Sequence, residues 1–388
     1  MKILYVTSGG SVHEQRFLQK FAESKHTFYY AYLRRNGEQY ADPRIPSYYL
    51  GFDADGPVGP ASRLWAGGRA YFRFRKLLQS LKPDVLHVGP VNSTGLFGAL
   101  CGFHPLLLMP WGSDILILPQ ESAFYRIASL YVIHRSDMIT CDCESVKTRI
   151  VELGQYPAER IVTFPWGIDL QQFRPSAGLR KELRSRLGCE SSKVILMNRA
   201  FLPVYGIEYF LRALPRVCQT VEDMCVLLIG EGPLKGALGS LVRELNLEKF
   251  VRIVGQVANE QMSSFLNAAD LYVSTSLSDG TSLSLLEAMA CHLPVIVTDV
   301  PANLEWVRDG VNGFVVPRRD VHRLADGIIE ILQNESLANH MGECNLKIAR
   351  ERADWNKNYA VLEEIYCELE ARFHLTGNGA ESGPRVHF

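Results

Sequence analysis

The chain alternates short apolar runs with amphipathic helical patterns, and it does so twice in succession. Buried parallel strands have this short, apolar character, and helices between them are typical of βαβ units. The pattern therefore predicts an α/β protein built from two Rossmann-like, doubly wound domains. Runs that predict strands cover Lys2–Thr7, Thr27–Leu33, Asp84–Val88, Leu106–Met109, Met138–Thr140 and Ile161–Phe164, then Val194–Met197, Cys225–Ile229, Val251–Val254, Leu271–Thr275, Val295–Thr298 and Phe314–Val316.

The length of 388 residues also fits two domains, since a single hydrophobic core rarely grows that large. We expect a first domain over residues 1–170, a linker with a bridging helix at 171–192, and a second domain over 193–352. An amphipathic pattern predicts a last helix at 353–373. The polar segment 374–388 is expected to be disordered.

Charge and hydropathy argue against a nucleic-acid-binding protein and against a membrane-spanning segment. The formal net charge of −1 supplies no global field that would attract nucleic acid. Met1 leads directly into an apolar run without a charged leader, so we expect a cytoplasmic protein. Gly95–Gly112 carries no formal charge, but it contains Pro105 and Pro110. A buried helix followed by a buried strand is therefore favoured there over a membrane span.

The segment from Ser276 to Asp299 is the most informative one for function. Asp279 sits in a loop of Gly, Ser and Thr, and Glu287 follows eight positions later inside an apolar helix. A helix N-terminus presents unpaired N–H groups and positive dipole charge, which suits a diphosphate. Carboxylates on either side of it can accept hydrogen bonds from hydroxyl groups. A sugar nucleotide has this layout of sugar, diphosphate and ribose.

This segment resembles the acidic pair of the retaining GT-B glycosyltransferases of family 4. Their pattern is two Glu separated by seven residues, followed by Ala-Met-Ala-x-x-x-Pro-Val; here Asp279 replaces the first Glu. The resemblance extends from Met1 to about Phe373 and is strongest from Val194 to Pro317. It implies two domains that face across a cleft, with the last helix crossing back to the first domain. It also implies a retaining, metal-independent hexosyltransferase whose UDP- or GDP-linked sugar is a substrate, with no cofactor.

Further motifs in the second half resemble the same family. Arg199 follows the first strand where relatives carry Gly-Arg, but Tyr205 stands where they carry a Lys. A neutral phenol can donate a hydrogen bond there, yet it supplies no charge. The turn that begins at Val254 resembles the family's nucleobase-binding turn. Gly230-Glu-Gly-Pro-Leu resembles a Gly-x-Gly-Pro-Leu turn, in which we expect a mainly structural role for the glycines.

Two motifs in the first half complete the resemblance. The Ser8-Gly9-Gly10 loop resembles the Gly-rich loop that closes near the donor phosphates. Trp111-Gly-Ser-Asp114 stands where many relatives carry His-Gly-x-Asp. An indole cannot act as an acid or base, so Asp114 is the better candidate for contact with the sugar or the acceptor.

The resemblance thus assigns roles to individual residues. Arg199 and the backbone around Ser282–Ser284 are expected to hold the diphosphate, Glu287 the ribose, and Asp279 the hydroxyls of the transferred sugar. The catalytic candidates are Asp279, Arg199 and Asp114, and the donor-binding candidates are Gly10, Arg199, Tyr205, Val254, Ser282, Leu283, Ser284 and Glu287. The expected acceptor is a sugar, lipid-linked or small-molecule hydroxyl, in polysaccharide, glycolipid or glycoconjugate synthesis. A sugar-nucleotide epimerase and a non-catalytic sugar-nucleotide binding protein are the alternatives.

Two remaining segments carry charge patterns. Asp53-Ala-Asp55 has the form of a metal-binding acid pair, but no apolar strand precedes it, so we interpret it as a solvated turn. Between Ser62 and Lys82, basic residues occur without any acid and are interleaved with aromatic ones. Peripheral association of Arg63–Lys82 with anionic lipid at the inner face of the membrane is one interpretation. A crossover helix with one charged face has the same composition, so both interpretations stay open.

Overall fold

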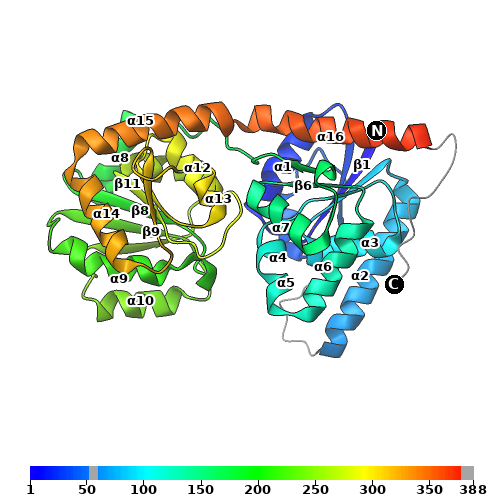
Figure 1. Ribbon diagram of the computed structural model, residues 1–388, viewed down its shortest axis with the longest axis horizontal. Helices are drawn as coiled ribbons and strands as arrows, with labels where there is room; N and C mark the ends of the chain where they lie inside the picture. The colour runs from blue at the N-terminus through cyan, green and yellow to red at the C-terminus, as the bar shows by residue number, and fades with distance from the viewer. Residues whose placement is uncertain (52–59, 377–388) are drawn as a thin grey trace. The chain divides into compact units, whose positions relative to one another are not determined.

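The computed structural model describes residues 1–51 and 60–376. Its contacts divide the chain into two compact units, which we describe separately (Figure 1). Unit 1 comprises Met1–Phe164 and the residues from Tyr359 onward, and unit 2 comprises Pro165–Asn358. The Asp53–Asp55 pair and most of the segment expected to be disordered lie outside the described residues.

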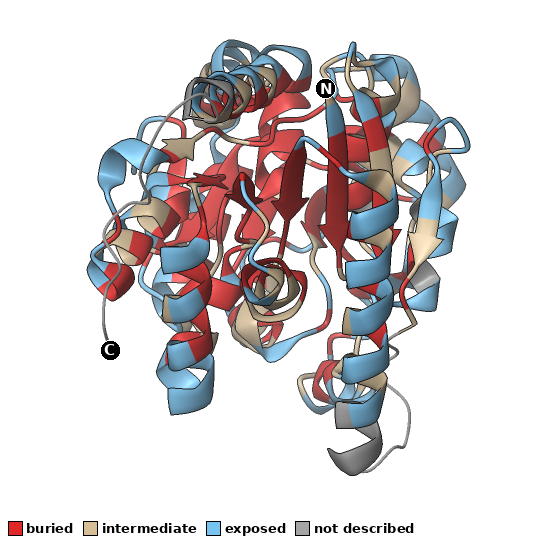
Figure 2. Ribbon diagram, turned by 90° about the vertical axis from the view of Figure 1, so that its right-hand side faces the viewer, coloured by how far each residue is buried: buried red, intermediate tan, exposed pale blue. Residues whose placement is uncertain are grey.

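Unit 1 is built on a parallel sheet with strand order β3-β2-β1-β4-β5-β6-β7. The chain starts in the middle of this sheet and winds outward in both directions, as in doubly wound folds. Its strands are almost entirely buried, whereas the helices expose their outward sides (Figure 2). The strands are β1 (Lys2–Thr7), β2 (Thr27–Tyr32), β3 (Ser47–Tyr49), β4 (Val85–Val88), β5 (Leu106–Leu108), β6 (Met138–Cys141) and β7 (Ile161–Thr163).

Helices cover both faces of this sheet. α16 packs on one face through Tyr366, whose hydroxyl lies 2.7 Å from Nδ1 of His87 on β4. Right-handed crossovers place α2, α3 and α6 together on the other face, and α3 contacts both α2 and α6. The helices are α1 (Val12–Glu23), α2 (Pro60–Leu81), α3 (Leu96–Cys101), α4 (Ser113–Leu116), α5 (Leu118–Glu121), α6 (Ala123–Arg135), α7 (Glu144–Gly154) and α16 (Trp355–Thr376). Short turns of 3₁₀ or π helix lie at Arg35–Tyr40, Val91–Gly95 and Ala158–Arg160.

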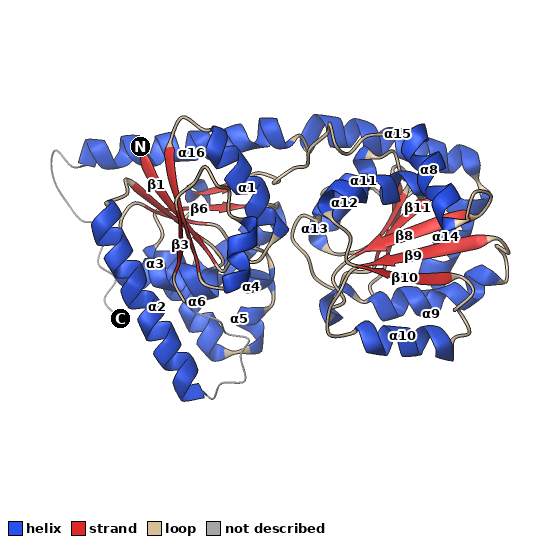
Figure 3. Cartoon of the chain, turned by 180° about the vertical axis from the view of Figure 1, so that it is seen from behind, coloured by secondary structure: helices blue, strands red, loops and turns tan. Residues whose placement is uncertain are grey.

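Unit 2 has a second parallel sheet, with strand order β10-β9-β8-β11-β12-β13 and helices on both faces (Figure 3). The strands are β8 (Lys193–Asn198), β9 (Met224–Ile229), β10 (Val251–Gly255), β11 (Leu271–Ser274), β12 (Val295–Thr298) and β13 (Gly313–Val316). The helices are α8 (Ala177–Leu187), α9 (Ile207–Cys218), α10 (Lys235–Glu244), α11 (Asn259–Ala268), α12 (Leu283–Ala290), α13 (Pro301–Leu304), α14 (Val321–Gln333) and α15 (Glu335–Arg352), with a 3₁₀ turn at Pro203–Tyr205. The predicted α/β class with two doubly wound sheets is therefore confirmed.

The segment at 171–192 holds α8, and this helix packs against α11 within unit 2. Two of its arginines share one carboxylate: Arg180 and Arg184 each donate to Asp270 at 2.5 Å. Asp270 also accepts from the backbone N–H of Val194 at 2.7 Å, so these bonds tie α8 to the first strand of the sheet. In the described part of the chain, no helix is both long enough and apolar enough to cross a membrane.

Candidate active site

The strand order of unit 2 reverses between β8 and β11, which lie side by side although β9 and β10 come between them in the sequence. In open α/β sheets, ligands bind beyond the carboxyl ends of the strands at such a reversal, because the two following loops diverge there. Arg199 directly follows β8, and the loop from Thr275 to Ser282 follows β11. The topology therefore brings the arginine and the acidic loop together.

Arg199 is the centre of this site. Its Nη1 donates to Ser282 Oγ at 2.7 Å and to Ser284 Oγ at 3.0 Å, and its Nη2 forms an ion pair with Asp279. Only 9% of the Arg199 side chain is exposed. Four residues that the sequence assigned to the site thus form one contiguous cluster. The guanidinium edge that was expected to hold a diphosphate makes all of these contacts with protein groups.

Tyr205 lies against the flat face of the same guanidinium. The centre of its ring is 4.0 Å from Arg199 Cζ, which is cation–π geometry. The turn that carries Tyr205 is held by Thr275, whose hydroxyl donates to the carbonyl oxygens of Tyr205 and Gly206 at 3.1 and 2.9 Å. Tyr205 therefore stands beside the arginine and contacts it through its ring.

Burial raises the pKa of the Asp279 carboxyl, and the adjacent Arg199 acts in the opposite direction. The Ser276 hydroxyl donates to Asp279 Oδ2 at 3.4 Å and stabilises the charged form. The Asp279 carboxylate and the Arg199 guanidinium are both largely buried, and burying either charge without the other would cost free energy. The two charges therefore stabilise each other within the cluster.

α12 begins at this cluster. Ser282 is its N-cap and accepts from the N–H of Leu285 at 3.4 Å, so the N–H groups of Leu283 and Ser284 belong to the first turn, where no preceding helical carbonyl is available. Glu287 follows one turn after Ser284 on the same side of the helix and is 5% exposed. The first turn of the helix thus lies beside Arg199, and the helix carries a buried carboxylate one turn later.

Two further residues of the cluster were not singled out as candidates in the sequence. The hydroxyl of the buried Tyr272, on β11, donates to Ser284 Oγ at 2.9 Å and supports the serine that contacts Arg199. In the sequence, Tyr272 is one residue of an apolar strand, so nothing there indicates that its hydroxyl contacts Ser284. Ser276 was part of the informative segment, but only the folded loop shows that it faces Asp279.

The glycines after β9 have a packing role. A Cβ on Gly230 would lie 2.1 Å from the carbonyl oxygen of Arg199, and one on Gly232 would lie 2.6 Å from that of Phe201. Both glycines also have a positive φ, which other residues rarely adopt. They let the turn press against the loop that carries Arg199. Val254 lies on β10, two strands away from β8, at the outer edge of the sheet.

The Gly-rich loop of unit 1 differs from expectation. Glu14 accepts hydrogen bonds from the N–H groups of Gly9 and Ser11 at 3.0 and 2.9 Å, and Gly10 adds a third. Burial raises the pKa of the Glu14 carboxyl, opposed by these bonds and one from Thr7. The loop amides, including that of Gly10, therefore turn inward to a carboxylate and do not present themselves to a phosphate. The capping box of α1 explains this arrangement.

Asp114 is also placed differently from the expected sugar or acceptor contact. It is 3% exposed, and its two oxygens accept from the backbone N–H groups of Val91 and Trp111 at 2.8 and 2.9 Å. Burial raises the pKa of its carboxyl to about 6, against the effect of these hydrogen bonds. Because both oxygens are directed into the protein, Asp114 orders the loops after β4 and β5 instead of facing solvent. Over residues 1–51 and 60–376, no group of His, Cys, Asp and Glu has the arrangement of a metal site.

Comparison with known proteins gives matches over both halves. Residues 180–347 match the family described as glycosyl transferases group 1, and residues 2–143 match the glycosyl transferase 4-like family. A glycosyltransferase of Methanocaldococcus jannaschii is 28% identical over 303 residues, which are 77% of this chain and 80% of that protein. The phosphatidyl-myo-inositol mannosyltransferase of Mycobacterium tuberculosis is 29% identical over 346 residues, covering 83% and 84% of the two chains.

Among solved structures, that of Anabaena HepE in complex with UDP-glucose superposes with a TM-score of 0.81. The two sequences are 20% identical, and the match covers 95% of this chain and all of the other, so it supports the fold. Taken together, the family matches and the shared fold confirm the resemblance seen in the motifs. The chain belongs to the group 1 glycosyl transferases and has the two-sheet α/β fold of GT-B glycosyltransferases.

Proposed function

We propose that this glycosyltransferase moves a hexosyl group from a nucleoside diphosphate sugar to an acceptor hydroxyl, with retention of the anomeric configuration and without a metal ion. The observation that carries the proposal is the cluster of Arg199, Asp279, Ser282 and Ser284 at the reversal of the sheet in unit 2. It combines a cation, a helix N-terminus and a carboxylate. A donor presents the matching groups, namely a dianionic diphosphate and sugar hydroxyls.

Each group of the cluster has a defined task. The first-turn N–H groups of α12 and the guanidinium of Arg199 hold the diphosphate, and the serine hydroxyls that Arg199 now contacts give way to phosphate oxygens. Asp279 accepts hydrogen bonds from hydroxyls of the transferred sugar. Glu287, about one turn further along α12, does the same for the ribose. The donor thus lies along the helix axis, with the sugar at the loop end.

The reaction requires little covalent participation by the protein. The bond between the anomeric carbon and the β-phosphate oxygen breaks, and a bond from the acceptor oxygen to that carbon forms on the same face of the sugar. The departing phosphate takes the acceptor proton, so atoms and charge balance without a protein base. Catalysis then comes mainly from stabilising the charge that develops on the diphosphate. Arg199 and the end of α12 supply that stabilisation.

Donor binding is assigned to unit 2 and acceptor binding to unit 1, with residues 353–373 joining them. The relatives suggest the chemical classes of the two substrates. HepE is seen with UDP-glucose, and the mycobacterial relative is named for transfer of mannose to phosphatidylinositol. We therefore infer a UDP- or GDP-linked hexose as donor and a sugar or lipid-linked hydroxyl as acceptor.

The test is incubation with radiolabelled UDP- and GDP-sugars, with and without EDTA, followed by NMR of the product. An α-linked donor is expected to give an α-linked product or slow release of the free α-sugar, and EDTA should leave the rate unchanged. A β-linked product would contradict retention. Loss of activity in EDTA that manganese restores would contradict metal independence. Isomerised donor with the nucleotide still attached would mean an epimerase, and binding alone a non-catalytic protein.

A further inference from the structure

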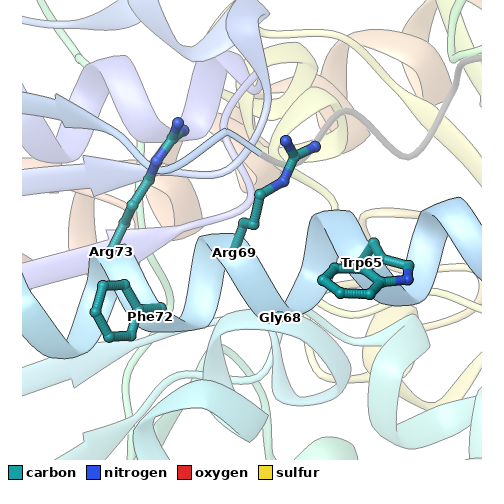
Figure 4. A pocket seen from close by; sticks show the side chains of 5 residues that line it. All are labelled: Trp65, Gly68, Arg69, Phe72 and Arg73. Atoms are coloured by element: carbon teal, nitrogen blue, oxygen red, sulfur yellow. The ribbon is translucent and has the colours of Figure 1, made fainter.

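The N-terminal part of α2 exposes large apolar side chains. Trp65 and Phe72 are 75% and 71% exposed, although side chains of this size usually lose most of their surface on folding. They lie seven residues apart, two helical turns, with Arg69 between them, so all three lie along one side of the helix (Figure 4). The opposite side of α2 is the buried one, through Ala70, Phe74 and Leu78.

The length of α2 explains this exposure. Its 22 residues span about 33 Å, whereas the four residues of β4, which follows it, span about 13 Å. A helix that runs antiparallel to such short strands and ends where β4 begins must extend beyond the carboxyl edge of the sheet. Trp65 lies in that extending part, where no strand can bury it.

A second helix of the same layer has the same character, and nothing in its sequence drew attention to it. On α6, Phe124 and Ile127 are 69% and 67% exposed, and Tyr131 continues their stripe one turn further along. Phe124 and Ile127 thus keep most of their surface outside the core of the unit, and Tyr131 keeps about a third of its own.

The two helices are linked through α3, which lies between them. Phe97 of α3 packs against Tyr71 and Phe74 of α2, with ring centres 5.5 and 6.0 Å apart, while Leu100 of α3 is exposed. Because α2, α3 and α6 all lie on the sheet face opposite α16, their outward sides form one surface of unit 1 (Figure 1). We call it the α2–α6 face; it carries Trp65, Arg69, Phe72, Leu100, Phe124 and Ile127.

The charge of this part of the chain is unlike that of the whole. Residues 60–136 contain eight Lys and Arg and three Asp and Glu, so their balance is +5, although the full chain has −1. One of the three acids, Asp114, is buried. The ion pairs of the described residues include none of Arg69, Arg75, Lys76 and Arg126. The segment that carries the exposed apolar groups is therefore rich in cations and poor in acids.

We propose that the α2–α6 face docks on the surface of a bilayer that contains anionic phospholipids. Trp and Phe with neighbouring arginines suit the boundary between headgroups and acyl chains, where the rings leave water and the cations meet phosphate. The aliphatic Leu100 and Ile127 gain from hydrocarbon but offer no ring on which a nucleobase could stack. A second copy bound through the same face would bring the two sets of cations together, which is unfavourable.

The proposal is tested with the full chain by flotation with vesicles of phosphatidylcholine, alone or mixed with phosphatidylglycerol. Binding is expected only to the mixed vesicles and is expected to weaken as salt rises, since each cation near the surface contributes roughly a fivefold factor. Trp65→Ser/Phe72→Ser should weaken binding by at least about tenfold. Arg69→Gln/Lys76→Gln should weaken it by roughly 25-fold, while transfer to a soluble acceptor stays unchanged.

Matched controls come from exposed side chains of unit 2. Leu304→Ser replaces an apolar residue that is half exposed, and Lys347→Gln/Arg350→Gln removes two exposed cations; neither should change vesicle binding. Equal binding to both kinds of vesicle, or equal loss in the control variants, would overturn the proposal. So would a dimer that Trp65→Ser/Phe72→Ser dissociates, or retention of the chain by DNA in place of vesicles, because each assigns the face to another partner.

Discussion

The ring of Tyr205 covers one face of the Arg199 guanidinium, 4.0 Å from its Cζ, while Asp279, Ser282 and Ser284 occupy its edge. The arginine is therefore held on two sides by groups from three different loops or helices. If phosphate oxygens replace the serine hydroxyls, as we propose, a guanidinium held in this way loses little further side-chain entropy. The position at which relatives carry a Lys thus holds a ring that packs on Arg199.

The first prediction separates the ring of Tyr205 from its hydroxyl. If stacking orients Arg199, Tyr205→Phe should leave the affinity for UDP or GDP nearly unchanged, whereas Tyr205→Leu should weaken it. Cation–π contacts of partly buried groups contribute about 0.5–2 kcal/mol, which corresponds to a loss of roughly twofold to thirtyfold. Calorimetry with the three proteins decides the matter. A Phe variant that binds as poorly as the Leu variant would show that the phenol hydroxyl contacts the phosphate.

A second prediction concerns the ion pair of Asp279 with Arg199. Asp279→Asn leaves the largely buried guanidinium without its counter-charge, so the unliganded variant should lose about 3 kcal/mol of stability. UDP supplies the missing negative charge and should therefore raise the melting temperature of the variant more than that of the wild type. Sugar transfer should fall at the same time, because the hydroxyl contact is changed.

The control for this prediction is an exposed pair of the same residue types in unit 2. Arg216 and Asp326 are 2.5 Å apart, but both side chains are about half exposed. Asp326→Asn should cost less than about 1 kcal/mol and should leave the response to UDP unchanged. If both variants lose the same stability and respond alike to UDP, Asp279 is not the counter-charge of the donor-binding arginine.

The fold of this chain could be read from its sequence because its strands are short, apolar and separated by clear helical patterns. Every predicted strand is present, with bounds that differ by at most one residue. Only Ser47–Tyr49 was missed among the described strands, since three residues after a Pro at the sheet edge give no apolar run. The proximity of Arg199 to the acidic loop at the reversal of the second sheet was also predictable, because each of them follows a strand.

What the sequence could not show is the direction in which polar groups turn. The Gly-rich loop and Asp114 occupy the expected places after strands, yet the loop amides face Glu14, and Asp114 faces backbone N–H groups. A spacing motif locates a residue along the chain but does not distinguish a carboxylate that binds a ligand from one that satisfies buried amides. Only the full set of hydrogen-bond partners makes that distinction.

A third prediction tests the ribose contact of Glu287. A carboxylate that accepts hydrogen bonds from ribose hydroxyls contributes about 1.5–3 kcal/mol, so Glu287→Ala should weaken UDP or GDP binding by roughly ten- to 150-fold. Inorganic pyrophosphate, which lacks a ribose, should bind the variant as it binds the wild type. The matched control is Glu330→Ala on the exposed side of α14. Equal loss of affinity for both ligands would point to a disturbed α12 and would remove the ribose assignment.

The last prediction follows from the pKa of about 6 that burial gives the Asp114 carboxyl, above its ordinary value of 3.8. An acid whose pKa is raised on folding favours the folded state while it is protonated. That contribution is fully present below about pH 4 and is lost as the pH rises through 6. The shift of about two units corresponds to about 3 kcal/mol. Asp114→Asn does not titrate and should lack this dependence.

The measurement is native-state hydrogen exchange of peptides that contain Val91 or Trp111, because the N–H groups of these two residues donate hydrogen bonds to Asp114. The exchange rates are corrected for the intrinsic effect of pH on exchange. Between pH 4 and 7, the difference in opening free energy between wild type and Asp114→Asn should shift by about 2.4 kcal/mol in favour of the variant. The quantity to compare is the change of opening free energy with pH. The absolute stability also changes in Asp114→Asn, because the Asn side chain offers one acceptor oxygen to two N–H donors. Parallel curves for the two proteins would mean that Asp114 ionises at its ordinary pKa, and its oxygens would then have to be open to water in solution.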